Sequence, residues 1–323
     1  MKKLLLSSAL VFALIGCGGT DKKETPKSTI YKGAVTKGDF ATFTLTNSTL
    51  SYKIDPSSSY YPGISGSLSL SNPFGKFFKD SSADANILIT DNLLIGKIPQ
   101  DTSNAYVVAL QSNNSINKDN IASKTYIYSH IDSNNNITLN TLRVNPNGTY
   151  SQYNINTDVV SSGCWKINNG HIAAKDGIND CTNVDSFDYN IVIKAGNKSA
   201  IIIDYANGDG VGIGLEQKAL TNSDINGTYY SYYYEQYTDN FAKIEIDNNN
   251  TVKWKMCPNG YCTSPWASGN LNLNQDCLGN PLNGVACADI GGNKYLTFID
   301  SKDGYYMAIS ADNTPFHVEV GSK

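Results

Sequence analysis

Short runs in which apolar and polar residues alternate with a period of two follow one another along most of this chain. Phe43-Thr44-Leu45 and Leu50-Ser51-Tyr52-Lys53-Ile54, for example, lie on either side of a turn at Asn47-Ser48. This alternation places successive side chains on opposite faces of a strand, so such pairs of runs predict β-hairpins with one buried face. No stretch shows a sustained helical period, and the sequence therefore predicts an all-β protein with little helix.

The middle and the end of the chain contain the same order of predicted strands and turns. When Gly163 is aligned with Gly269, Cys181 is also aligned with Cys287 without a gap between them. This agreement in register indicates two related units rather than a chance similarity. Residues 30–117 follow the same order more loosely and are interpreted as a further unit of the same kind.

We therefore predict three tandem β units at residues 30–117, 118–220 and 221–323, each of about 90 to 105 residues. Units of this size are domains rather than the short turns of a solenoid. Each is predicted to be an antiparallel meander of about six to eight strands. Small barrels and sandwiches share the same alternating pattern, so the sequence leaves open which of the two is formed.

The third unit opens with Gly227-Thr228-Tyr229. A Gly-x-Tyr opening followed by a meander of hairpins resembles the calycin architecture of lipocalins and avidins. The resemblance covers this motif and the strand order alone. The tryptophan expected in that family is absent, and a lipocalin is longer than these units. The resemblance implies a barrel-like fold rather than membership of the family.

The N-terminal segment predicts export. Lys2 and Lys3 precede an apolar run from Leu4 to Ile15, which is shorter than the roughly 20 apolar residues of a membrane-spanning helix. This layout predicts a signal peptide at residues 1–16. Leu14-Ile15-Gly16-Cys17 resembles the lipobox of bacterial lipoproteins. The resemblance implies cleavage before Cys17, a diacylglyceryl thioether on its sulfur and acylation of its new amino group by a fatty acid such as palmitate. A plain signal peptide followed by an accidental cysteine is the alternative.

The residues after the lipobox predict a spacer. Residues 20–29 contain no large apolar side chain, so residues 17–29 are interpreted as a flexible tether between the lipid and the first unit. Gly18 stands where Asp retains lipoproteins at the inner membrane of enteric bacteria, and this analogy implies the outer membrane. No later segment approaches the length of a spanning helix, so the membrane contact is expected to be the lipid anchor. The sequence leaves open which side of the membrane the protein faces.

The remaining cysteines predict disulfides, because an even number of cysteines in an exported chain is typical of a disulfide framework. Cys164 and Cys181 are the only two in the middle unit and are expected to bond to each other. The six cysteines are Cys164, Cys181, Cys257, Cys262, Cys277 and Cys287.

The four cysteines of the last unit allow three pairings, which the sequence does not decide rigorously. The turn from Cys257 to Cys262 favours a bond between these two, which leaves Cys277 with Cys287. A zinc site is the alternative, but the gaps of four, fourteen and nine residues do not match the usual C-x2-C spacing. We therefore expect disulfides and no metal.

Six tyrosines within nine residues form the strongest candidate for a binding surface. They cannot all face one core, because neighbouring strand residues point to opposite sides. Exposed tyrosines suit the recognition of a protein or a glycan, since each combines a large apolar area with a polar tip. Alternatively, every second tyrosine packs inside while the others cover a sheet or a domain junction. The six are Tyr229, Tyr230, Tyr232, Tyr233, Tyr234 and Tyr237.

The chain carries no recognisable catalytic or cofactor motif. Its histidines, His130, His171 and His317, are scattered and lack a partner motif. Asp204, Asn207 and Asp209 bring oxygen ligands together, but their spacing fits a turn better than a calcium loop. Charged residues make up 17% of the chain, the net charge is -4 and no basic patch is present, which argues against a nucleic-acid partner.

The sequence thus predicts a lipid-anchored envelope protein with a non-enzymatic binding or surface-recognition role and no cofactor. Its expected partners are the membrane, through the lipid, and a protein or glycan. The alternative is a barrel-type carrier of a small apolar or sugar ligand. A second alternative is a hydrolase with a dispersed carboxylate site, since no motif would reveal one.

Overall fold

A computed structural model describes most of the three predicted units. The signal peptide at 1–16, Cys17, most of the tether and Tyr237 lie outside the described residues. The described residues are 27–36, 40–56, 63–99, 104–112, 116, 118–131, 136–154, 158–168, 170–184, 186–193, 200–205, 210–235, 238–300, 303–311 and 317–323.

The fold class predicted from the alternating pattern is confirmed. In the described part of the chain, antiparallel strands form three successive sheets, which span residues 28–111, 124–216 and 227–322. Helical structure there is limited to α1 (Asn222–Ile225) and the 3-10 turns η1 (Lys118–Asn120) and η2 (Pro258–Gly260). No helix among these residues has the length and apolar character needed to cross a membrane.

The first unit is a nine-stranded meander with the order β4-β3-β2-β1-β9-β8-β7-β6-β5. Its two edge strands are consecutive in sequence and are separated by Leu70 alone, so one bent segment pairs with β3 before the bend and with β6 after it. The strands are β1 (Ser28–Val35), β2 (Phe40–Thr46), β3 (Thr49–Ile54), β4 (Ile64–Ser69), β5 (Ser71–Phe74), β6 (Phe77–Asp80), β7 (Ala85–Ile89), β8 (Leu93–Pro99) and β9 (Asn104–Gln111).

Asp80 holds this bend in place. Its carboxylate accepts hydrogen bonds from the Ser82 hydroxyl at 2.6 Å and from the Ser69 backbone N–H at 2.9 Å. These donors, the Ser82 hydroxyl first, keep the pKa of Asp80 below its usual value. The backbone N–H of Leu70 at the bend donates to the Ser48 carbonyl at 2.8 Å. The two edge strands of the first sheet are thereby held together at this bend.

The second unit is a closed barrel of eight strands. Pairing of its first and last strands closes it, with Tyr128 opposite Gly214. Ile121, which follows η1, is buried in the barrel interior. The strands are β10 (Lys124–Ile131), β11 (Ile137–Val144), β12 (Thr149–Asn154), β13 (Val159–Asn168), β14 (His171–Asp176), β15 (Tyr189–Ile193), β16 (Ala200–Tyr205) and β17 (Val211–Glu216).

The third unit is a second closed barrel with the same strand order. Its closing pair places Ser231 opposite Gly321. Both later units are thus barrels rather than sandwiches, which decides the question that the sequence left open. The strands are β18 (Gly227–Glu235), β19 (Thr238–Ile246), β20 (Thr251–Met256), β21 (Ala267–Gln275), β22 (Pro281–Ile290), β23 (Asn293–Asp300), β24 (Tyr305–Ser310) and β25 (His317–Ser322).

The glycines that anchored the repeat alignment are structurally equivalent, but the aligned cysteines are not. Gly163 and Gly269 both lie in the fourth strand of a barrel, where an added Cβ would lie 1.9 Å and 1.7 Å from a carbonyl oxygen of the next strand. Gly163 pairs with Asp176, whereas Gly269 pairs with Ile290. The hairpin is therefore longer in the third unit, and the ungapped match of the cysteines is not a structural register.

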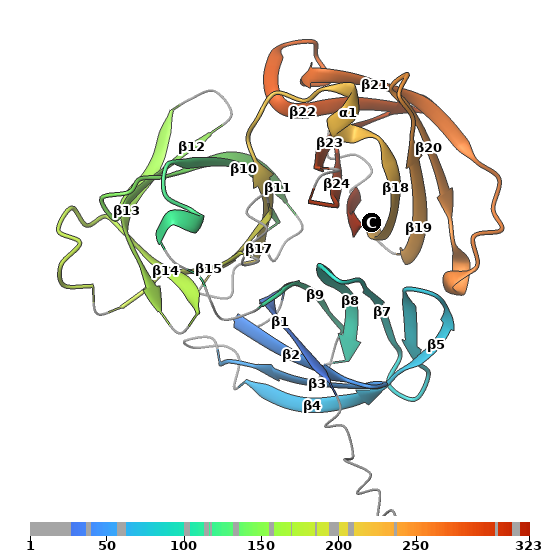
Figure 1. Ribbon diagram of the computed structural model, residues 1–323, viewed down its shortest axis with the longest axis horizontal. Helices are drawn as coiled ribbons and strands as arrows, with labels where there is room; N and C mark the ends of the chain where they lie inside the picture. Colours follow the sequence, from blue (N-terminus) through green and yellow to red (C-terminus); the bar gives the residue numbers. More distant parts are fainter. Residues whose placement is uncertain are drawn as a thin grey trace, which may run out of the picture.

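The three units pack around a common centre (Figure 1). One apolar cluster contains residues of all three units, among them Leu93 and Val108, Ile202 and Ile213, and Met307 and Val320. These residues come from β8, β9, β16, β17, β24 and β25, which are buried on both faces where the structure describes their side chains. The outer faces of these strands form the interface between the units, while their inner faces line the interiors of the three sheets.

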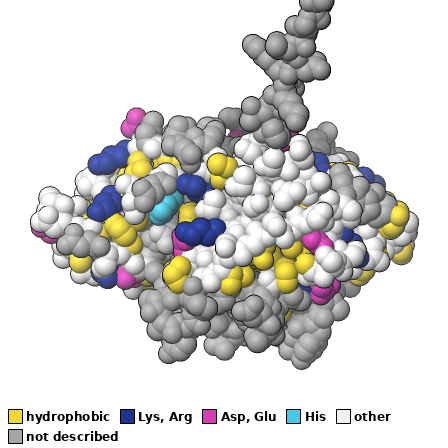
Figure 2. Space-filling view, turned by 90° about the horizontal axis from the view of Figure 1, so that it is seen from below, with side chains coloured by type: hydrophobic (Ala, Val, Ile, Leu, Met, Phe, Trp, Pro, Cys, Tyr) yellow, Lys and Arg dark blue, Asp and Glu magenta, His cyan; other side chains and the backbone are white. Residues whose placement is uncertain are grey.

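Charged and apolar side chains are mixed on the face that carries the first unit. In Figure 2, basic and acidic side chains are dispersed over this face, and apolar side chains lie in small groups rather than in one patch.

Candidate binding site in the third barrel

A cavity of about 320 Å³, called the chamber below, lies in the third barrel at the end where β22 turns into β23. Gly291 and Asn293 of that turn are exposed, while His317 and Glu319 are only 4% and 2% exposed. The chamber therefore leads from the surface to a buried carboxylate. Its lining residues are Trp254, Ala267, Ile290, Gly291, Asn293, Tyr295, Tyr306, Ala308, His317 and Glu319.

Hydrogen-bond donors, rather than a lysine or arginine, hold the carboxylate of Glu319. The Ser231 hydroxyl and the Trp254 indole N–H both donate to Oε1, the latter at 3.1 Å, and the Tyr306 hydroxyl bonds to the same carboxylate. Nε2 of His317 lies 3.6 Å from Oε2. No lysine or arginine of the described part of the chain forms an ion pair with Glu319. Such donors offset the cost of burying a charge.

Aromatic rings surround this carboxylate. The ring of His317 stacks on Tyr233, with centroids 5.5 Å apart and planes at 18°, and meets Tyr295 edge-on at 5.0 Å. Burial, together with the charge of Glu319, raises the pKa of Tyr306 well above its usual value. The Tyr306 hydroxyl therefore stays protonated and can donate to the carboxylate.

The opposite end of the barrel is filled by the segment that precedes β18. The buried side chains of Leu220 and Ile225 belong to the interior cluster of this barrel. The Tyr229 hydroxyl donates to the Ile225 carbonyl at 3.2 Å, and the Thr221 backbone N–H donates to the Asp224 carboxylate at 2.9 Å. These contacts fix α1 at that end, so the free volume lies toward the β22–β23 turn.

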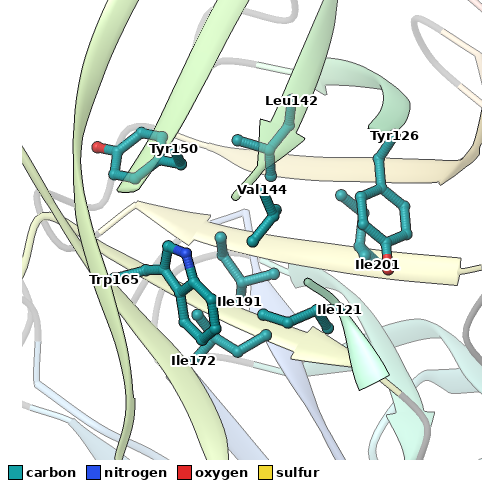
Figure 3. Close-up of a pocket in the computed structure, with 9 residues that line it drawn as sticks. All are labelled: Ile121, Tyr126, Leu142, Val144, Tyr150, Trp165, Ile172, Ile191 and Ile201. Atoms are coloured by element: carbon teal, nitrogen blue, oxygen red, sulfur yellow. The ribbon is translucent and has the colours of Figure 1, made fainter. Parts of the chain in front are cut away.

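Among the described residues of the second barrel, the cavity in the apolar core is far smaller than the chamber. The cavity there measures about 10 Å³, and the side chains around it point toward one another across the interior (Figure 3). These side chains are Ile121, Tyr126, Leu142, Val144, Tyr150, Trp165, Ile172, Ile191 and Ile201.

Strand pairing shows which substitutions create the chamber. Gly212 of β17 pairs with Ile203, and Glu319 at the corresponding position of β25 pairs with Ala308. In the same way Tyr205 pairs with Tyr189, whereas Ser310 pairs with Tyr295. Small side chains in β24 thus replace the large ones of β16, and a carboxylate replaces a glycine.

In the second barrel, a hydrogen-bonded cluster is built at the end that corresponds to the chamber. The hydroxyls of Tyr150 and Tyr189 donate to the carboxylate of Asp176, and the ring of His130 stacks on Tyr205 at 4.2 Å. Burial and hydrogen bonding to Asp176 raise the pKa values of Tyr150 and Tyr189 above their usual range. Here the carboxylate is satisfied by tyrosines of the barrel itself.

The six cysteines form three disulfides, Cys164–Cys181, Cys257–Cys262 and Cys277–Cys287. These are the pairings that the sequence favoured. The Cys257–Cys262 bond closes the start of the loop between β20 and β21, at the same end of the barrel as the chamber.

The tyrosines of β18 do not form the exposed surface predicted for them. Tyr229 and Tyr233 point into the barrel, and both are 2% exposed or less. Tyr230, Tyr232 and Tyr234 face the first unit. The predicted exposure is wrong for Tyr229, Tyr232 and Tyr233, which are buried, whereas Tyr230 and Tyr234 are half-buried. The reason is that β18 lies between the barrel core and an inter-unit interface, which is the alternative that the sequence analysis considered.

Contacts of Phe77 and Tyr106 define this interface. Tyr230 lies 5.9 Å from Phe77, and Tyr234 lies 4.1 Å from Tyr106, between ring centroids. Tyr232, which is 2% exposed, lies 6.4 Å from Tyr106. The tyrosines on this side of β18 therefore join the first unit to the third.

The three histidines are not brought together. His171 packs on Phe40 at 4.7 Å, His130 lies on Tyr205, and His317 alone lines the chamber. No group of three potential metal ligands occurs among the residues that the structure describes. Of the oxygen ligands considered for calcium, Asp204 is buried in β16, and Asn207 and Asp209 lie outside the described residues.

Sequence reasoning missed Glu319, the central residue of the chamber. Its signal is the alternation His317-Val318-Glu319-Val320 in the last strand. The valines face the other units and the two polar residues face inward. A charged residue between two valines would have indicated a buried polar site had the last strand been known to be buried on both faces.

Comparison with known proteins gives matches among solved structures alone. No protein-family model matches the chain, and no curated protein matches it. Among solved structures, transferrin binding protein B of Haemophilus parasuis Hp5 is similar, with 9% identity over 92% of this chain and 76% of that one and a TM-score of 0.29. Isotype 1 transferrin binding protein B of serogroup B Neisseria meningitidis shows 10% identity over 88% of this chain and 66% of that one, with a TM-score of 0.26.

Proposed function

We propose that this protein is a lipid-anchored envelope protein that binds a small molecule in the chamber of its third barrel, without catalysing a reaction on it. One observation carries the proposal: a cavity of about 320 Å³ ends at the buried carboxylate of Glu319. Small-molecule sites are concave, largely apolar and fitted with a few placed polar groups, and their volumes are about 300–1,000 Å³.

The contrast with the second barrel supports a binding role. Both an unfilled cavity and a buried charge destabilise a fold. The same topology in the second barrel is filled by Ile203 and Tyr205, so the barrel architecture itself does not require the chamber. A ligand that fills the chamber would stabilise the third barrel in the way that side chains stabilise the second.

The anchor is proposed from the sequence. Leu14-Ile15-Gly16-Cys17 supplies the cleavage and lipidation pattern, and residues 17–29 supply a tether. In the proposal, the lipid holds the binding protein at the envelope, at the outer membrane if the rule of enteric bacteria applies, while the three units remain outside the bilayer.

Native mass spectrometry of the mature protein, extracted from its own envelope in mild detergent, tests the binding role. We expect a reproducible adduct that is lost on denaturation. The control is Ala308→Ile, which places in the chamber the side chain that Ile203 contributes to the second barrel. Absence of an adduct from the wild-type protein, or its persistence in Ala308→Ile, would contradict a ligand in the chamber.

Fatty-acid labelling in the producing cell tests the anchor separately. The wild-type protein should incorporate the label and sediment with membranes, because two or more acyl chains hold a protein stably. Cys17→Ser should abolish both the incorporation of the label and the sedimentation with membranes. Membrane association of the unlabelled variant would show that something other than the lipid holds the protein.

Recognition of a protein or glycan partner is the second candidate function. Tyr261 and Trp266 lie on the loop between β20 and β21 and are 54% and 38% exposed. The Lys255 ammonium lies 4.4 Å from the centre of the Trp266 ring. Exposed aromatic side chains of this kind suit recognition. Tyr261→Ala with Trp266→Ala should release such a partner and leave the chamber adduct unchanged, and retention of the partner would argue against this surface.

A further inference from the structure

We infer that the chamber selects ligands with a protonated amine, whose positive charge the carboxylate of Glu319 attracts and whose apolar body the aromatic walls enclose. This inference rests on the proposed binding function and adds the chemical class of the ligand.

The charge of the site is the first argument. Glu319 is 2% exposed and lines the chamber. Ser231, Trp254 and Tyr306 donate hydrogen bonds to it, but these groups bring no positive charge. The basic side chain within ion-pair distance in the described part of the chain is the imidazole of His317, at 3.6 Å. A buried carboxylate without a lysine or arginine partner is therefore complementary to a cationic ligand.

The walls are the second argument. Trp254, Tyr295 and Tyr306 line the chamber together with Glu319. The faces of such rings attract cations within about 6 Å, most strongly when the cation is desolvated. A carboxylate and several aromatic rings around one small volume favour an ammonium group over an anion, which Glu319 would repel.

The supply of hydrogen-bonding groups argues against a sugar. A sugar needs several donors and acceptors around its hydroxyls. In the chamber the Trp254 N–H and the Tyr306 hydroxyl are already bound to Glu319. Ala267, Ile290 and Ala308 add apolar surface, and the other polar side chains of the lining are Asn293 at the exposed turn, Tyr295 and His317. One anionic group among mainly apolar and aromatic walls suits an amine with a short aryl or alkyl body.

The second barrel shows what the chamber lacks. There the hydroxyls of Tyr150 and Tyr189 donate to Asp176, and the ring of Tyr205 fills the interior beside Tyr189. In the third barrel the position of Tyr205 is taken by Ser310, which leaves space beside Tyr295. Both carboxylates thus accept hydrogen bonds from their own barrel, but that of Glu319 also lines a chamber.

Isothermal titration calorimetry on the lipidated mature protein in detergent tests the inference. The probes are a panel of arylalkyl and alkyl amines, each paired with the alcohol of the same skeleton, for example 2-phenylethylamine with 2-phenylethanol, and a set of monosaccharides. At pH 7 we expect amines to bind at least tenfold more tightly than their alcohols. Glu319→Gln, which keeps acceptor oxygen for Ser231 and Trp254, should erase that preference. Tyr295→Leu, which keeps the carboxylate, should weaken amines more than alcohols.

Each other outcome has a distinct meaning. Equal binding of amines and alcohols that Ala308→Ile abolishes would overturn the amine inference and leave the proposed function standing, as would binding of a monosaccharide alone. Failure of every probe to bind would overturn the amine inference, and the adduct in the native mass spectrum would then decide separately whether the proposed function stands. Because the wild-type preference is measured first, a folding defect in a variant does not remove the test.

Discussion

The second and third barrels have the same number and order of strands, and both close by pairing of the first strand with the last, yet their described cavities differ in size. The cavity described in the apolar core of the second barrel measures about 10 Å³, and the chamber of the third measures about 320 Å³. A few inward positions account for this difference, chiefly Ile203 against Ala308 and Tyr205 against Ser310. The interior of a small barrel is therefore decided by the size of its inward side chains rather than by its topology.

The largest expected effect comes from hollowing the second barrel. Ile203 is fully buried, so Ile203→Ala should lower the free energy of unfolding by about 2–5 kcal/mol, through lost burial and the cavity left behind. The matched change, Ala308→Ile in the third barrel, should be neutral or stabilise by about 0.5–2 kcal/mol, because it fills existing space. Urea unfolding of both variants measures these changes in the free energy of unfolding. Equal losses in the two would show that the third barrel is packed as tightly as the second.

A smaller effect is expected at Gly212 of the second barrel, which stands at the position of Glu319 in the third barrel. A Cβ added at Gly212 would lie 2.9 Å from the Cβ of Ile203 and 3.3 Å from Cδ2 of Tyr128. Gly212→Ala should therefore destabilise by about 1–3 kcal/mol through overpacking. In the double variant with Ile203→Gly the penalty should shrink, because that change removes the Cβ of residue 203 that the new methyl group would meet. Additive losses in the double-mutant cycle would show that crowding against Ile203 is not the cause.

The smallest effect concerns alkaline pH. Tyr128 fills the second barrel where Ser231 stands in the third, and burial raises the pKa of Tyr128 to about 12. A raised pKa favours the protonated form in the folded state. Its stabilising contribution is thus complete below pH 10 and is lost as the pH rises from about 10 to about 12.

Comparison of wild type with Tyr128→Phe measures this contribution. The free energy of unfolding in urea should fall between pH 9 and pH 11.5. We expect this fall to be larger for the wild type than for Tyr128→Phe by about 1–2 kcal/mol. An identical pH dependence of the two proteins would show that Tyr128 titrates normally.

The tyrosine strand shows how far sequence reasoning reaches. Alternation in residues 229–234 correctly divides the tyrosines between two faces of β18. It does not say that Phe77 and Tyr106 of another unit cover the second face. Packing between units is signalled elsewhere in the sequence by runs without alternation, such as Ala200–Asp204. A strand that is buried on both faces has a continuously apolar sequence.

Two levels of determination can be separated in this protein. Local pattern was sufficient for the strands, for the division into related units and for disulfides between cysteines close in sequence, because period, turn chemistry and short loops act over a few residues. Closure of the sheets, the burial of β18 and the meeting of Glu319 with Ser231 and Trp254 depend on residues far apart in the chain. Only the tertiary structure decides these, since a barrel interior exists only after the first strand pairs with the last.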